Sequence, residues 1–201
     1  MDFNWLIPVI IALMVYACVY YYLKSRKVLP HVIDFMGPCI MIKTERVGFF
    51  DTLARPKKLL YAYATAGVLI TLLCAVVVTV MFLVSGILSL TVQTDPIPPQ
   101  DLLLIPGLNS YVPSTFAVWF ALFFAMIIHE AGHGIISRVE KMRVKSTGLL
   151  TLIIPIGAFV ESYGEDVEKA TLGSKLRMFA AGITNNMVVG TICLVLLAAL
   201  L

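Results

Sequence analysis

Charged residues are scarce in this chain of 201 residues. Lys, Arg, Asp and Glu together make up 13% of it, whereas hydrophobic residues make up 60%. Soluble domains carry about 25% charged residues, so the composition excludes an ordinary soluble fold and indicates a polytopic membrane protein. The net charge is +3. Because the basic residues lie at the ends of apolar runs and form no continuous stripe, no nucleic-acid partner is expected.

Cysteine and histidine are also rare. The four cysteines lie far apart and mostly within apolar runs, at Cys18, Cys39, Cys74 and Cys193. They are expected to act as small hydrophobic residues, and neither a disulfide framework nor a cysteine metal site is predicted. The chain has only three histidines. A di-iron oxygenase site needs many more, so this class is disfavoured.

Long apolar runs predict an all-α polytopic membrane protein with about four transmembrane helices. The expected spans are residues 5–22, 59–90, 116–136 and 178–201. Basic clusters follow the first and third runs and precede the second and fourth, so the positive-inside rule places these ends in the cytoplasm and the N-terminus outside. The charges of the first run follow its apolar stretch, which indicates an uncleaved anchor and not a signal peptide.

The connecting segments differ in composition. Residues 28–56 are mixed and polar, with a turn at Gly37-Pro38 and a short strand-like run at 39–42, and are expected at the cytoplasmic interface. Residues 91–115 contain five prolines and are expected to form an external loop.

The third apolar run contains His129, Glu130 and His133. On a helix, the two histidines lie on one face a turn apart, where two imidazoles can bind one metal ion. Glu130 beside them can take a proton from a metal-bound water as a general base. The same pattern also occurs on exposed polar faces of soluble helices. At membrane depth, however, unpaired ionisable groups are costly, and this favours the metal site.

The depth of this site follows from the helix rise. Arg138, at the cytoplasmic end of the run, comes nine residues after His129. At 1.5 Å per residue this is about 14 Å. The metal site is therefore expected inside the membrane, nearer its cytoplasmic side.

Residues 149–161 are apolar but are interrupted by Pro155 and Gly157. Irregular backbone survives within a membrane only where protein or a polar cavity satisfies it, so a re-entrant loop or β-hairpin near the metal site is predicted. An exposed edge of such a hairpin could bind an unwound substrate as an added strand. A simple interfacial loop is the alternative.

Two amides, Asn185 and Asn186, lie near the start of the last apolar run. They can be interfacial polar residues or can form hydrogen bonds between helices. Alternatively, one of them reaches the metal site and fixes the substrate or an oxyanion. The small residues Ala181 and Gly182 would allow the close helix approach that this requires.

Three motifs together resemble the site-2 protease family of intramembrane zinc metalloproteases. They are His-Glu-Ala-Gly-His-Gly at 129–134, Gly-Ala-Phe-Val-Glu at 157–161 and Ala-Gly-Ile-Thr-Asn-Asn at 181–186. Their order and the basic link between them fit the same family. The resemblance covers about residues 116–190, with weaker likeness around Gly37-Pro38 and Pro106-Gly107.

The resemblance implies a function and roles for individual residues. It implies zinc bound by His129 and His133, Glu130 as the catalytic base, and cleavage of a transmembrane segment of a membrane-bound regulatory protein. The partners it implies are a transmembrane protein substrate and the lipid bilayer. The substrate-binding residues it implies are Gly157, Ala158, Phe159, Val160 and Asn186.

The sequence departs from this family at the third metal ligand. Catalytic zinc takes three protein ligands and an open water position. In the family the third ligand is an aspartate of an Asp-Gly pair on a later helix, and no residue here matches it. Asp166 lies between Glu165 and Glu168 in a predicted loop. The third ligand is therefore expected downstream of Leu201, and this chain is expected to be the N-terminal part of a longer enzyme, with reduced or no activity alone.

The predicted organisation has three parts. Residues 1–58 form an anchor helix and an interfacial segment, residues 59–115 a second transmembrane helix and the external loop, and residues 116–201 an incomplete catalytic membrane core. Two other functions remain open. One is a membrane zinc protease of the CAAX-processing type, which the 157–161 motif disfavours, and the other is a non-catalytic metal-binding membrane protein.

Overall fold

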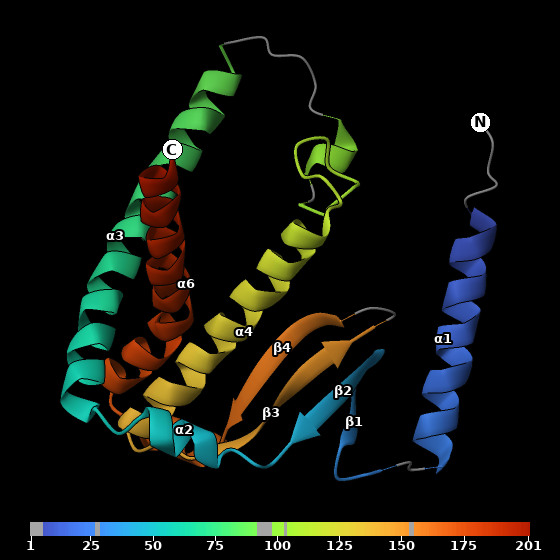
Figure 1. Ribbon diagram of the computed structural model, residues 1–201, viewed down its shortest axis with the longest axis horizontal. Coiled ribbons are helices and arrows are strands. Elements are labelled where there is room, and N and C mark those ends of the chain that lie inside the picture. Colours follow the sequence, from blue (N-terminus) through green and yellow to red (C-terminus); the bar gives the residue numbers. More distant parts are fainter. Residues whose placement is uncertain (1–5, 27–28, 92–97, 103, 153–154) are drawn as a thin grey trace.

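A computed structural model describes residues 6–26, 29–91, 98–102, 104–152 and 155–201 (Figure 1). Its helices are α1 (Leu6–Arg26), α2 (Gly48–Leu53), α3 (Lys57–Ser89), the 3-10 helix η2 (Pro99–Leu102), α4 (Phe116–Val139), α5 (Gly164–Lys169) and α6 (Leu172–Leu200). Its strands are β1 (Ile33–Met36), β2 (Cys39–Thr44), β3 (Val144–Thr151) and β4 (Pro155–Ser162). The protein is mostly helical, with one sheet set against the helices.

Within the described residues, three helices are long and apolar enough to cross a membrane, namely α3, α4 and α6. Large apolar side chains cover their outer surfaces, and Leu73 and Phe82 of α3 are 64% and 79% exposed. Such surfaces suit a lipid environment and would be a liability in water. The first predicted span starts at Trp5, which lies outside the described residues, and its remainder forms α1. The total number of spans and their orientation stay predictions.

The predicted helix at 178–201 begins earlier than expected. Thr171 has extended backbone, and its side chain accepts a hydrogen bond from the Ser174 backbone N–H at 3.2 Å. This N-cap satisfies an otherwise unpaired helix donor and starts α6 at Leu172. Thr115 caps α4 in the same way through Val118. Hydropathy alone predicted the start of α4 at Phe116 correctly, whereas the start of α6 follows from its N-cap.

The prediction of an all-α protein holds only in part, because the described residues also contain a four-stranded antiparallel sheet in the order β1-β2-β3-β4. Strand β2 pairs with β3, about a hundred residues later, which no local pattern predicts. Gly148 permits this pairing, since a Cβ there would lie 2.0 Å from the Ile42 carbonyl oxygen. The predicted turn at Gly37 is confirmed, and Gly37 has a left-handed φ of +57°.

The β-hairpin predicted within residues 149–161 is confirmed as β3 and β4, which pair from Val144↔Ser162 to Thr151↔Pro155. Residues 153 and 154 of the predicted segment lie outside the described residues. That the hairpin is re-entrant stays a prediction. Strands from the first and third predicted parts of the chain share the sheet, while the division into three parts stays a prediction.

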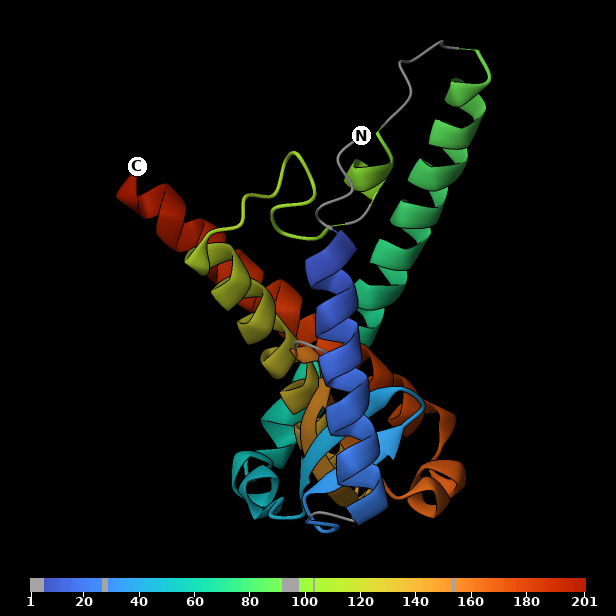
Figure 2. The ribbon, with the colours of Figure 1, turned by 90° about the vertical axis from the view of Figure 1, so that its right-hand side faces the viewer.

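The buried core lies where α2, the start of α3, the end of α4 and the start of α6 meet. Ala64, Ile136, Met142 and Ala181 are each at most 2% exposed there. From this end, α4 and α6 continue side by side, while α3 leans away from them (Figure 2). Helix α1 stands on the far side of the sheet, where Tyr20 donates a hydrogen bond to the Gly37 carbonyl oxygen at 2.7 Å.

Candidate metal centre

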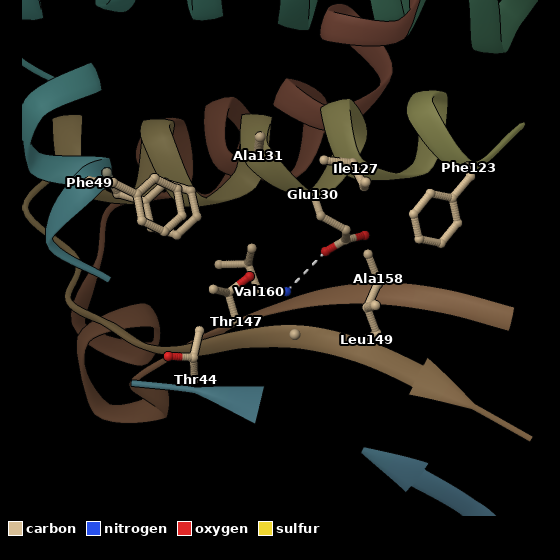
Figure 3. Close-up of a pocket in the computed structure, with 12 residues that line it drawn as sticks. Thr44, Phe49, Phe123, Ile127, Glu130, Ala131, Thr147, Leu149, Ala158 and Val160 are labelled. Atoms are coloured by element: carbon tan, nitrogen blue, oxygen red, sulfur yellow. Dashed lines mark hydrogen bonds between the residues drawn. The ribbon is translucent and has the colours of Figure 1, made fainter. Parts of the chain in front are cut away.

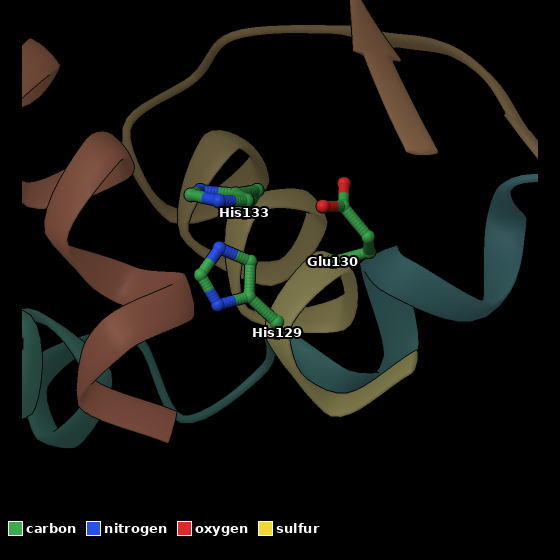
Figure 4. Close-up of side chains that lie close together, drawn as sticks. All are labelled: His129, Glu130 and His133. Atoms are coloured by element: carbon green, nitrogen blue, oxygen red, sulfur yellow. The ribbon is translucent and has the colours of Figure 1, made fainter. Parts of the chain in front are cut away.

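The histidine pair lies on α4, in the half of the helix that packs against both α6 and β4. The ring centroids of His129 and His133 are 4.9 Å apart. One ligand atom from each histidine and one carboxylate oxygen of Glu130 all lie within 4.8 Å of one another (Figure 4). The helical repeat predicted this placement, because residues four apart share a face.

Two glycines bring α6 against this part of α4. A Cβ on Gly182 would lie 2.5 Å from His129 Nε2, and a Cβ on Gly132 would lie 2.7 Å from the Ala181 carbonyl oxygen. Neither distance is tolerated by a side chain, so the two backbones can approach only where these residues are glycine. The close approach predicted at Ala181-Gly182 is confirmed.

Helix α6 also orients both imidazoles. His133 Nδ1 lies 2.8 Å from the Met178 carbonyl oxygen. A carbonyl can only accept, so Nδ1 carries the proton, and the Nε2 lone pair of His133 is left for a metal. His133 thus has the tautomer that a metal ligand requires.

Asn186 lies within hydrogen-bond distance of the other histidine, His129. Its side-chain nitrogen lies 3.3 Å from His129 Nδ1, while its buried side-chain oxygen has no hydrogen-bond partner among the described residues. Turning the amide by 180° gives that oxygen the Nδ1–H of His129 as its donor. In this arrangement His129, like His133, keeps Nε2 free for a metal. If His129 binds a metal through Nε2, its Nδ1 carries a proton, and the unpartnered Asn186 Oδ1 gains that proton's hydrogen bond.

Glu130 points away from α6 towards the sheet. Its Oε2 accepts a hydrogen bond from the Val160 backbone N–H of β4 at 3.1 Å (Figure 3). The carboxylate borders a cavity of about 320 Å³ with an almost wholly apolar lining. Its lining includes Phe49, Phe50, Phe123, Ile127, Ala158 and Val160.

A second cavity, of about 280 Å³, lies between β4, α4 and the start of α6. His133 borders it, together with Ser162 and Phe179. Val160 borders this cavity and the one beside Glu130. His133 and the carboxylate of Glu130 therefore both adjoin strand β4.

Comparison with known proteins identifies this region. The model of peptidase family M50 matches residues 117–201. We refer to residues 117–201, which this family model matches, as the M50 region. Peptidase family M50 is the site-2 protease family, so the sequence resemblance is confirmed, and its members are zinc metallopeptidases.

One relative is an uncharacterized protein of Methanocaldococcus jannaschii, which is 36% identical over 70 residues. The match covers 34% of this chain and 19% of that protein. This chain therefore aligns with only about a fifth of the relative's length. No solved structure matches the chain.

The M50 region fits a zinc ion in its donor chemistry. Zinc in hydrolytic sites is bound by imidazole nitrogens and carboxylate oxygens, and these are the donors that α4 brings together. The missing side chain of Gly182 leaves space beside His129 Nε2. His129 and His133 are therefore the residues that would hold the ion.

Four of the five predicted substrate residues lie along β4, and the fifth, Asn186, lies on α6. Ala158 and Val160 face the cavity beside Glu130, and alternation along the strand turns Gly157 and Phe159 to the opposite face. The four residues of β4 thus divide between the two faces of the hairpin.

A hydrogen-bonded link through Asn185 joins three helices of this centre, which agrees with the predicted alternative of hydrogen bonds between helices, but sequence reasoning missed Tyr63 as a partner. Tyr63 of α3 donates to Asn185 Oδ1 at 2.7 Å, and Asn185 Nδ2 donates to the Ile128 carbonyl oxygen of α4 at 3.0 Å. Only the Asn185-Asn186 pair itself signalled it. The two amides have separate partners, Asn185 the α4 backbone and Asn186 the His129 ring.

The acidic residues after β4 are engaged elsewhere. Asp166 accepts hydrogen bonds from the Arg143 side chain at 2.8 and 2.9 Å, and these bonds lower the pKa of Asp166 to about 2. The ammonium of Lys145 on β3 donates a hydrogen bond to the Glu161 carboxylate on β4 at 2.8 Å. This bond lowers the pKa of Glu161. Among the described residues, the one group of three possible metal ligands is that on α4. A third protein ligand downstream of Leu201 stays a prediction.

Proposed function

We propose that this chain carries the metal-binding part of an intramembrane zinc metalloprotease that cleaves a transmembrane segment of a membrane-bound regulatory protein. The observation that carries the proposal is the grouping of His129, Glu130 and His133 within 4.8 Å on a helix of membrane-spanning length. Ionisable groups inside a membrane cost free energy unless they are paired or face a polar cavity. Their presence there therefore indicates a functional site.

In this proposal, the residues of α4 and α6 divide the work. His129 and His133 hold the ion through Nε2, while Asn186 and the Met178 carbonyl fix the two rings. Zinc chemistry at these residues would supply an activated water and a polarised substrate carbonyl. Glu130 then transfers a proton. It accepts one from the attacking water and returns it to the leaving amine as the C–N bond breaks.

The substrate has to present an extended backbone to this site. The carbonyl groups of a transmembrane helix are occupied by helical hydrogen bonds, so the segment must unwind before its peptide bonds can be attacked. Strand β4 forms one end of the sheet, and its residues Ala158 and Val160 border the same cavity as Glu130. We infer that the unwound substrate binds along this edge as an added strand.

The proposed setting is a multi-pass protein with its N-terminus outside. Basic residues then lie on the cytoplasmic side, together with the end of α4 and the start of α6. The metal centre lies within the bilayer, nearer the cytoplasm. A transmembrane protein and the surrounding lipid are the proposed partners, and no nucleic acid is expected.

The proposal is tested with Glu130→Gln in the complete enzyme. The amide keeps the shape of the side chain but cannot take a proton, so proteolysis should fall by about two to four orders of magnitude. Zinc content should stay at the level of the unaltered protein, because both imidazoles are retained. The measurements are cleavage of a membrane-protein substrate in liposomes and metal analysis of the same preparation.

The matched control is Glu168→Gln, which makes the same chemical change at an exposed position on α5. This variant should cleave at the unaltered rate. Full proteolysis by Glu130→Gln would remove Glu130 from the mechanism. A complete protein that contains no zinc, or one that still cleaves after both His129 and His133 become alanine, would overturn the metalloprotease proposal.

A further inference from the structure

The inference concerns the hydrogen bond between the proposed base and the proposed substrate strand. The Val160 N–H donates to Glu130 Oε2 at 3.1 Å. Val160 is paired with Thr147 of β3, yet this N–H is directed to α4 and not to β3. It therefore belongs to the outer edge of β4.

An outer-edge N–H is what an added strand uses. In an antiparallel sheet, alternate residues direct their N–H and C=O groups to the same neighbour. In the described part of the chain β4 has a strand on one side only, that of β3. A substrate strand bound on the other side would therefore place a carbonyl oxygen at the Val160 N–H.

Space for such a strand exists beside Val160. The cavity of about 280 Å³ bordered by His133 and Ser162 lies next to this residue. An extended segment in this cavity would pass the metal-binding face of α4. The Val160 N–H has one proton to donate, and the carboxylate of Glu130 now accepts it.

We propose that Glu130 and the substrate backbone compete for the Val160 N–H, so that docking of the substrate strand releases the catalytic carboxylate. This rests on the proposed function. In the free protein the N–H holds Glu130 towards the sheet. When a substrate carbonyl takes that N–H, Glu130 Oε2 is free to accept the proton of the attacking water. The base is thus restrained until a strand lies on β4.

The test is a double-mutant cycle on binding of a probe that needs no metal. The probe is a short fluorescent peptide of alternating valine and threonine with terminal lysines, and its binding to the full chain in detergent micelles with EDTA is followed by fluorescence anisotropy. Glu130→Ala removes the competing acceptor. Because a hydrogen bond to a charged group is then no longer broken on docking, affinity should rise by roughly tenfold.

The two backgrounds of the cycle, Val160→Ala and Val160→Pro, are chosen to differ in whether residue 160 has an amide proton. Val160→Ala shortens the side chain but retains the N–H, so Glu130→Ala should still tighten binding in that background. Val160→Pro removes the N–H, which an edge strand tolerates, so Glu130→Ala should leave the affinity unchanged there. Equal gains in both backgrounds, or no gain in either, would overturn the proposal.

A second measurement does not depend on proline being tolerated. In protein labelled with ¹⁵N-valine, the Val160 amide proton should move upfield in Glu130→Ala, because its charged acceptor is lost. Addition of the peptide should shift the same signal in the unaltered protein. If the chemical shift of the Val160 amide proton does not change when the peptide is added, the N–H stays bonded to Glu130, and the proposed competition is overturned. Zinc binding and the loss of proteolysis in Glu130→Gln would still stand, so the two proposals can fail separately.

Discussion

The two sides of α4 are built differently. On the α6 side, glycines bring two backbones into contact, and Asn185, Asn186 and the Met178 carbonyl hold α4 and its histidines. On the β4 side, one hydrogen bond joins Glu130 to the strand, and cavities of about 320 and 280 Å³ lie next to Val160.

Under the proposed function, this contrast would separate metal binding on the α6 side from substrate binding on the β4 side. Metal ligands must be held to within a fraction of an ångström, which requires tight packing and fixed tautomers. A peptide substrate instead needs space and unpaired backbone groups. Helix α4 meets both needs because its 3.6-residue repeat turns adjacent residues, such as His129 and Glu130, to different neighbours.

The largest effect on the packed side is expected from Arg177→Met. Arg177 of α6 bonds Glu140 at 2.6 Å, and the two side chains are 13% and 7% exposed. Removal of the guanidinium leaves a buried carboxylate unpaired, so stability should fall by about 3–5 kcal/mol. The measurement is unfolding in mixed micelles. The double variant Glu140→Met with Arg177→Met should recover most of the loss, and failure to recover would show that packing of the arginine stem dominates.

The next effect is that of Gly182→Ala on the metal. The new Cβ would lie 2.5 Å from His129 Nε2 and would displace the ring. Zinc affinity should fall by about 10- to 100-fold, with a loss of about 1–3 kcal/mol in stability. Metal titration and unfolding measure the two changes.

Gly190→Ala is the control in the same helix, because nothing lies within 4 Å of a Cβ there. It should retain zinc and gain up to about 1 kcal/mol from helix propensity. Unchanged zinc binding in Gly182→Ala would mean that the close approach of α6 is not required for the metal.

A smaller effect is expected from Tyr63→Phe. The hydroxyl donates to Asn185 at 2.7 Å, and its loss should cost about 1 kcal/mol in the unfolding free energy. Tyr22→Phe on α1, where the side chain is 61% exposed, should cost nothing measurable. If the two variants unfold alike, the link from α3 to α4 through Asn185 contributes no stability.

The smallest effect is at the base of the hairpin. Arg143 lowers the pKa of Asp166 from 3.8 to about 2. A lowered pKa in the folded state gives stability that is present above the ordinary pKa and is lost as the pH falls from 3.8 towards 2. Asp166→Asn should therefore flatten the pH dependence of stability in this window, measured by unfolding midpoints. Glu168→Gln should leave the dependence as it was.

Prediction from sequence succeeded where the relevant distances are short along the chain. The helix around His129 and His133 followed from an apolar run and a spacing of four, and the hairpin followed from Pro155 and Gly157. Prediction failed for the sheet as a whole. The strand-like run predicted at 39–42 does form part of β2, but its partner β3 lies about a hundred residues away, so the pairing could not be predicted.

The hydrogen bonds that hold the side chains of the centre could not be predicted from the sequence either. The Met178 carbonyl and the Val160 N–H belong to the backbone, which is the same at every residue and leaves no trace in side-chain patterns. The roles of Asn185 and Asn186 could not be separated either, since adjacent residues on a helix point about 100° apart and only the packing of α6 shows what each one meets.

The amino-acid sequence by itself indicated a membrane protein with a region similar to peptidase family M50, because hydropathy, helical spacing and motif order are properties of neighbouring residues. Tertiary structure alone decided which atoms hold the imidazoles and that Glu130 is bonded to β4. Those contacts join α4 to residues 30 to 57 positions further along the chain, and their geometry exists only after the helices and the sheet have packed.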